Sequence, residues 1–178
     1  MEKSNINMNK QKHFGKLSAR GFTIIELIVV IAIIAVLAGI VLVNVQGYIK
    51  KAQNAQTLAD VGNYVKALEM ARAQNGTYPS TSNSIVCLGH YSSGSCWNGA
   101  IYNSSATETS LKPFIAGLPG NTNKICPSTL SDCYNGYTYR STGSAVTILY
   151  MLDGASQSCG VGTVLASYTN ATYCIFSR

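Results

Sequence analysis

A single carboxylate, Glu26, lies inside an almost unbroken apolar run that extends from Gly21 to Val45. A carboxylate at the edge or in the interior of a membrane span costs about 3 kcal/mol, so it is usually a functional group with a partner. The apolar run contains no lysine or arginine that could pair with it. The partner of Glu26 is therefore the first question that the sequence raises.

Six cysteines are the second set of residues that could do chemistry, and all of them follow the apolar run. An even number on one side of such a run indicates disulfides in an oxidising compartment. There is no Cys-x-x-Cys pair, and His13 and His90 lie far apart, so metal binding is the weaker interpretation. The sequence does not fix the pairing; the simplest, sequential one joins Cys87 to Cys96, Cys126 to Cys133 and Cys159 to Cys174.

The remaining polar residues do not predict an enzyme. A hydrolase needs a nucleophile, a base and an orienting group, and the C-terminal part offers only His90, Glu108, Asp132 and Asp153 beside its serines. No Gly-x-Ser-x-Gly turn and no Gly-rich phosphate loop is present. Asp132 and Asp153 lack the clustered spacing of a calcium loop, so exposed turn carboxylates are the simpler interpretation. We expect no catalytic residue, no cofactor and no metal.

The positive charge is concentrated before the apolar run. Of a formal net charge of +6, four charges come from residues 1–20, which hold five Lys or Arg and one Glu. No dense basic patch follows Val45. The charge pattern therefore does not support nucleic acid as a partner.

The apolar run has the length of a membrane span. Residues 22–45 would form a helix of about 36 Å, compared with about 30 Å of hydrocarbon in a bilayer. Five cations precede the run and only Lys50 and Lys51 follow it closely, which predicts a cytoplasmic N-terminus and cysteines outside. We expect residues 1–21 to be a basic leader, excluded from the fold, and residues 22–46 to be a transmembrane and assembly helix.

A secretory signal peptide cut after Ala38 is an alternative, and it would release a disulfide-rich binding or enzymatic domain. Three features weaken it. The apolar run continues past that point to Val45, it carries Glu26 near its start, and it leads without a turn into a second helical pattern.

Residues 47–178 predict a small α+β head. A helix over residues 47–75 has an apolar face with Asp60 on another side, and Asn75-Gly76 and Pro79 end it. No proline interrupts residues 22–74, so the two helical segments should form one helix. The expected inward face consists of Leu58, Val61, Val65 and Leu68, extended by Ala52, Ala55 and Ala71.

The rest of the head predicts a loop region over residues 76–135 and an antiparallel sheet over 136–178. Residues 80–110 are rich in Ser, Asn, Gly and Thr and indicate a long loop, followed over 111–118 by a short helical or irregular piece around Pro113. Residues 137–141 and 145–152 form a predicted hairpin, and residues 163–168 and 172–177 two further strands. The fold class is therefore α+β, with one helix laid on a small antiparallel sheet.

The segment Gly21-Phe22-Thr23-Ile24-Ile25-Glu26-Leu27 resembles the processing signal of type IV prepilins and type II secretion pseudopilins. A basic leader ending in glycine, then phenylalanine, then glutamate four residues later at the start of an apolar helix, carries the resemblance. It extends less strictly to residues 74–79, which resemble the turn that ends the long pilin helix.

This resemblance implies a pilin-like fold and a place for each site residue. A prepilin peptidase and methyltransferase would cut between Gly21 and Phe22 and methylate the new amine. Glu26 would then neutralise the Phe22 amine of its own chain or of a neighbouring subunit as the helices associate. The implied partners are the membrane, other pilin or pseudopilin subunits and an inner-membrane assembly platform.

The leading hypothesis is a non-catalytic subunit of a type IV pilus-like filament, made as a single-pass inner-membrane precursor and then built into an extracellular or periplasmic filament. The alternative within the same family is a pseudopilin of a type II secretion system. One departure concerns position 43, where many pilins have a helix-breaking proline and this chain has Val43. Extensive unwinding of the helix in a filament is therefore not expected.

Overall fold

The structure is a computed structural model that describes residues 21–89, 96–97, 104–120 and 123–178. The chain divides into two compact units, Met1–Val43 and Asn44–Arg178, and each is described by itself. Residues 1–20 of the expected leader, and His90, lie outside the described residues.

The long helix α1 extends from Ile24 to Asn75. Its end is the predicted one, because Gly76 has a positive φ of 78° and its N–H donates to the Arg72 carbonyl over 2.8 Å. Within the described residues, no single helix is long and apolar enough to cross a membrane. By length and composition alone, the segments Ile24–Ile40 and Val45–Asn75 reach that limit only when they are taken together as a bent pair.

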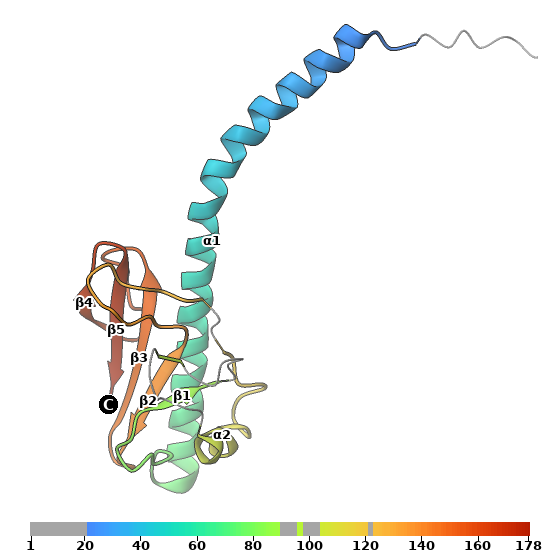
Figure 1. The fold of residues 1–178 in the computed structure, drawn as a ribbon. Helices are drawn as coiled ribbons and strands as arrows, with labels where there is room; N and C mark the ends of the chain where they lie inside the picture. Colours follow the sequence, from blue (N-terminus) through green and yellow to red (C-terminus); the bar gives the residue numbers. More distant parts are fainter. Residues whose placement is uncertain (1–20, 90–95, 98–103, 121–122) are drawn as a thin grey trace, which may run out of the picture. The chain divides into compact units, whose positions relative to one another are not determined.

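In the second unit, α1 packs one face against a sheet (Figure 1). Val61, Leu68 and Ala71 are buried as expected, and Leu58 and Val65 are half-buried against the same core. Tyr64 and Ala67 complete this face.

Two expectations for the α1 face were wrong. Ala52 and Ala55 are exposed, because the inward positions at that level belong to Asn54 and Thr57, which lie about 100–160° away around the helix. Asp60 is buried rather than on a solvent face. Its carboxylate accepts hydrogen bonds from the Tyr137 hydroxyl over 2.8 Å and from the Gln56 amide over 2.7 Å, which compensate its burial.

The sheet confirms the predicted α+β class. It has five antiparallel strands in the order β1-β2-β3-β5-β4. Gly143, with a φ of 93°, lies in the turn of the predicted hairpin. The strands are β1 (Val86–Leu88), β2 (Tyr137–Ser141), β3 (Val146–Asp153), β4 (Thr163–Ser167) and β5 (Ala171–Ser177).

The described part of the expected long loop over residues 80–110 contains two short elements that the composition did not predict. β1 pairs with β2, so Val86 lies opposite Tyr139. Helix α2 (Ser105–Leu111) ends where the helical or irregular piece was expected to begin, and Ser104 caps it by accepting from the Thr107 N–H. A strand of three residues and a helix of seven residues are too short for their periodicity to be recognised in a Ser/Asn/Gly-rich segment.

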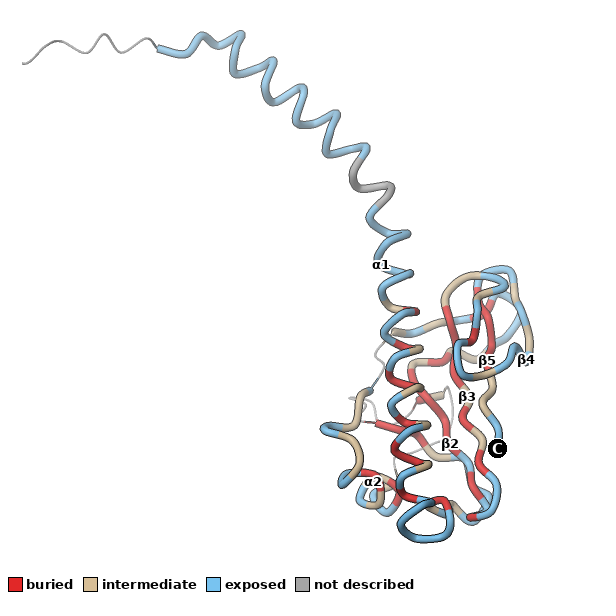
Figure 2. Tube along the Cα trace, turned by 180° about the vertical axis from the view of Figure 1, so that it is seen from behind, coloured by how far each residue is buried: buried red, intermediate tan, exposed pale blue. Residues whose placement is uncertain are grey.

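The main core lies between α1 and the sheet, where Figure 2 shows buried stretches on both. Tyrosines contribute much of its volume. The rings of Tyr64 and Tyr137 meet edge to face, with centroids 5.9 Å apart. A second cluster contains Tyr134, Met151 and Tyr173.

Three disulfides, which follow the sequential order, staple the head. They join Cys87 to Cys96, Cys126 to Cys133 and Cys159 to Cys174. The last pair is part of the main core, and it connects the segment before β4 to β5. Cys126, by contrast, is exposed.

Candidate functional site

The candidate site lies where the chain enters α1. Gly21 and Phe22 precede the helix, and Phe22 is 91% exposed. A Cβ built on Gly21 would meet no atom within 4 Å. The peptide bond between these residues is therefore outside the helix, and no atom of the described residues crowds a side chain built at Gly21.

Glu26 lies in the first turn of α1 and is held there by Thr23. Thr23 donates to Glu26 Oε2 twice, from its backbone N–H over 2.8 Å and from its hydroxyl over 2.9 Å. The Glu26 N–H donates back to Thr23 Oγ1 over 3.2 Å. This reciprocal pair is a capping box, which satisfies two backbone donors that the helix start otherwise leaves unpaired.

The capping box also holds the Glu26 carboxylate at the N-terminal end of the helix. A negative charge is favourable there because of the helix dipole. Sequence reasoning did not single out Thr23, although the pattern Thr-x-x-Glu before an apolar run is the signal that finds it. The structure therefore brings together Thr23 and Glu26 beside the Gly21–Phe22 bond.

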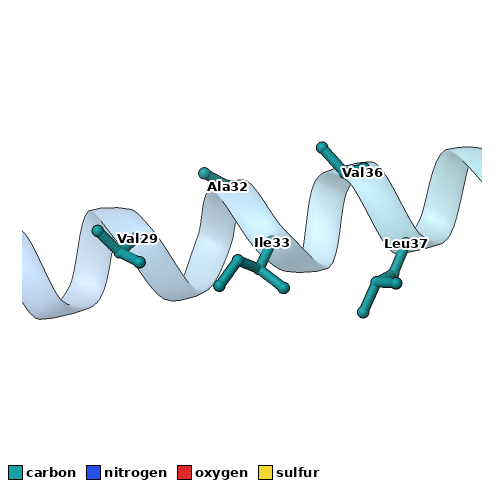
Figure 3. Close-up of a pocket in the computed structure, with 5 residues that line it drawn as sticks. All are labelled: Val29, Ala32, Ile33, Val36 and Leu37. Atoms are coloured by element: carbon teal, nitrogen blue, oxygen red, sulfur yellow. The ribbon is translucent and has the colours of Figure 1, made fainter.

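The helix that follows is apolar and exposed on every side. All residues from 21 to 40 are exposed (Figure 2). Spacing of three and four places five side chains along one face, as Figure 3 shows. They line an open hollow of about 350 Å³, here called the Ala32 hollow: Val29, Ala32, Ile33, Val36 and Leu37.

The polar residues considered for catalysis lie on different elements of the head. Asp153 ends β3 and pairs with Lys50 over 3.0 Å, whereas Asp132 accepts from the Trp97 ring N–H over 3.3 Å. Glu108 is on α2, where one of its carboxylate oxygens is buried and has no hydrogen-bond partner among the described residues. Among the described residues, no three His, Cys, Asp or Glu side chains are grouped to hold a metal.

A long N-terminal helix that begins with a capped carboxylate and ends on a small antiparallel sheet defines a pilin-like subunit. Comparison with known proteins agrees. The family model described as the prokaryotic N-terminal methylation motif matches residues 16–42. The type IV wide pilus major component PilA4 of Thermus thermophilus is 35% identical over 105 residues, which cover 59% of this chain and 78% of that protein.

Shorter matches involve the type II secretion system core protein G. The Pectobacterium carotovorum protein is 39% identical over 69 residues, 39% of this chain and 44% of the relative. The Escherichia coli protein is also 39% identical over 69 residues, which cover 48% of its length. The match therefore covers about half of the length of these two relatives or less. No solved structure matches. The chain belongs to the family of type IV pilins and type II secretion pseudopilins that carry the N-terminal methylation motif.

Proposed function

We propose that this chain is a structural, non-catalytic subunit of a type IV pilus-like filament that polymerises through its N-terminal helix. One observation carries the proposal: the first unit presents an apolar helix exposed on every side, with a single carboxylate at its first turn. Such a surface requires a membrane or other apolar helices as its surroundings. A filament subunit uses both in succession.

The proposed precursor has three parts. Residues 1–21 are the leader, residues 22–46 the membrane and assembly helix, and residues 47–178 the head. The excess of cations before the apolar run keeps the leader cytoplasmic and places the disulfide-bonded head outside. The precursor would lie in the inner membrane, and the finished filament would be extracellular or periplasmic, built by an inner-membrane assembly platform.

A prepilin peptidase is the proposed partner that cuts between Gly21 and Phe22 and methylates the new amine. A side chain at position 21 would meet no atom of the described residues within 4 Å, so their fold does not require glycine there. A requirement for glycine there would come from recognition by the peptidase. The exposure of Phe22 supports access to the bond.

Glu26 would receive the new amine as its partner. Its carboxylate already accepts from the N–H of Thr23, the residue next to Phe22, and so lies at the end of the helix where the amine is created. Pairing within one chain and pairing with a neighbouring subunit both neutralise the two charges in an apolar environment. We infer that the first holds before polymerisation and the second after it.

Intact mass of the mature protein tests the processing. A methylated chain that begins at Phe22 is expected, whereas signal peptidase would leave an unmethylated chain beginning at Gly39, seventeen residues shorter. Changing Gly21 to leucine should leave uncut precursor in the membrane. Normal removal of the leader from Gly21→Leu would count against a prepilin peptidase.

A type II secretion pseudopilin is the second candidate, and it rests on seven relatives named core protein G, which are 34–39% identical. These matches cover 38–40% of this chain, compared with 59% for the pilus component. Deletion of the gene distinguishes the two. Loss of surface filaments supports the pilus, and loss of exported enzymes with no change in filaments supports secretion.

A further inference from the structure

A small polar hollow lies beside the hairpin formed by β2 and β3 (Figure 1). Its volume is about 110 Å³, compared with about 30 Å³ for one water in the liquid, so it has room for a single small group. It is here called the Arg140 hollow, and it is lined by Asn83, Arg140, Ser141, Thr142, Ala145 and Thr147.

Strand alternation places Arg140 and Thr147 on the face of the sheet that points away from α1. Their neighbours Tyr139 and Ile148 are fully buried in the core beneath α1, and successive side chains of a strand point to opposite faces. Arg140 lies directly opposite Thr147 in the register of β2 and β3. A guanidinium group and a hydroxyl group are therefore cross-strand neighbours at the hollow.

The third side chain, Asn83, is held by a turn with an unusual backbone. Ser82 and Asn83 have positive φ angles of 52° and 64°, which cost free energy in residues other than glycine. The N–H groups of Thr81 and Asn83 both donate to the Ser141 carbonyl, over 3.1 and 3.2 Å, and so fix the turn against β2. Backbone strain of this kind is common where a segment positions a ligand-binding group.

The side chains of Asn83, Arg140 and Thr147 have no partner in the part of the chain that the structure describes. The two ion pairs found there use other cations, and no hydrogen bond between described residues involves these three side chains. A guanidinium offers five donors, an amide two and a hydroxyl one. The hollow therefore presents unused donors around one positive charge, which suits an oxyanion.

The chain has no carboxylate of its own to fill the hollow. Residues 47–178 contain five acidic residues, and none of them is exposed. A second copy offers the same set, so charge pairing between copies does not supply the anion. The five are Asp60, which is buried, and Glu69, Glu108, Asp132 and Asp153, which are half-buried.

We propose that the Arg140 hollow binds one phosphate group, as free phosphate or as a phosphate monoester. Donor side chains from three segments match the three oxygens that a tetrahedral phosphate presents, whereas a carboxylate presents two. Arg140 is the one cation in the described lining, so the site takes a single phosphate group and not a polyanion. The proposal adds a ligand to the outer face of the head and does not depend on polymerisation.

Equilibrium dialysis with radiolabelled inorganic phosphate tests the site. The mature chain is solubilised in an uncharged detergent that contains no phosphate, and ionic strength is kept constant with chloride. We expect saturable binding of one phosphate per chain. Arg140→Gln should weaken the affinity at least about tenfold, because it removes hydrogen bonds from a charged donor.

Lys66→Gln is the matched control, because it changes the net charge equally. Lys66 is exposed on α1 and does not line the hollow. It should bind phosphate as the unsubstituted chain does. Equal weakening by Arg140→Gln and Lys66→Gln would show attraction by net charge alone and would overturn the proposal.

Thr147→Val is a second variant, which keeps the shape of the side chain and removes its hydroxyl. It should weaken phosphate binding about fivefold while the head still melts normally. Competition with glycerol phosphate identifies the source: tighter binding than inorganic phosphate indicates a monoester, and weaker binding indicates the free ion. No saturable binding by the unsubstituted chain would remove the site and leave the proposed function unaffected, since the test needs no filament.

Discussion

The side-chain amide of Asn54 pairs with the backbone of Asp153 through two hydrogen bonds. Asn54 Nδ2 donates to the Asp153 carbonyl and the Asp153 N–H donates to Asn54 Oδ1, each over 2.8 Å. Asn54 is 9% exposed, so this partly buried pair joins α1 to the end of β3. The adjacent ion pair between Lys50 and Asp153 contributes less, because the lysine side chain is 55% exposed.

Changing Asn54 to alanine should therefore destabilise the head. Two backbone groups of Asp153 would lose their hydrogen-bond partners. Each group that stays buried without a partner should lower the free energy of unfolding by about 1–3 kcal/mol. Denaturant unfolding of the detergent-solubilised chain measures the loss. Asn63→Ala is the matched control, since Asn63 is an exposed asparagine on the same helix, and equal losses from both variants would contradict the role of the pair.

Glu26→Val should permit removal of the leader but impair assembly. The variant keeps the apolar helix and the Gly21–Phe22 bond, and it loses the carboxylate that neutralises the new amine. We expect filament yield to fall at least about tenfold in electron micrographs and sheared fractions, with mature protein accumulating in the membrane.

The control for Glu26 is Thr23→Ser, which retains the hydroxyl that donates to the carboxylate. It should assemble nearly as well as the unsubstituted chain. Normal filaments from Glu26→Val would show that charge pairing at the helix start is dispensable.

Gly162 should not tolerate alanine. An added Cβ would lie 2.6 Å from Tyr150 Oη and 2.7 Å from the Ile175 carbonyl oxygen, so the backbone before β4 would have to move. Crowding of this kind costs about 1–3 kcal/mol. Gly62→Ala should have the opposite effect, because Gly62 is inside α1 and a Cβ added there would meet no described atom within 4 Å. The substitution should raise the free energy of unfolding by about 0.5–1 kcal/mol. Thermal melting of both variants checks the difference in sign.

The three disulfides should differ in their resistance to reduction. Cys159 and Cys174 are 4% and 0% exposed within the main core, whereas Cys126 is exposed. Mild reductant followed by alkylation and mass spectrometry should label Cys126 and Cys133 first. Replacing Cys159 and Cys174 by serine should lower the free energy of unfolding by about 3 kcal/mol. Replacing Cys126 and Cys133 should lower it by about 0.7 kcal/mol less, because that disulfide closes a shorter loop. Earlier labelling of Cys174 would contradict this order.

Stability of the head should fall in alkaline solution. Burial raises the pKa of Tyr139 and of Tyr150 to about 12, from an ordinary value of 10. Between pH 10 and 12 the unfolded chain loses these protons while the folded chain keeps them. The contribution of these two tyrosines to the stability of the head is therefore complete below pH 10 and is lost as the pH rises through 12.

A rapid pH jump with absorbance detection of tyrosinate measures this titration before disulfides rearrange. Tyr139→Phe should remove part of the alkaline loss, whereas Tyr48→Phe should not, since Tyr48 is 70% exposed. Titration of all tyrosines near pH 10 in the folded protein would exclude the effect.

The amino-acid sequence was sufficient for the elements whose pattern is local and long. The uninterrupted apolar run, the Asn75-Gly76 stop and the alternation along β2 and β3 each depend on neighbours within a few residues. The same holds for the motif around Gly21, Phe22 and Glu26, where residue identity and spacing are the signal. Hydrophobic periodicity and helix capping act over one or two turns, so they can be read from the chain alone.

Only the tertiary structure decided which side chains are buried where burial depends on a partner that is distant in sequence. Asp60 is polar and was expected at the surface, but the Tyr137 hydroxyl, 77 residues away, provides the hydrogen bond that permits its burial. Ala52 and Ala55 continue an apolar face in the sequence, yet they are exposed because Asn54 meets the backbone of Asp153 instead. A polar group can be buried wherever a distant element satisfies it, and local periodicity carries no information about that element.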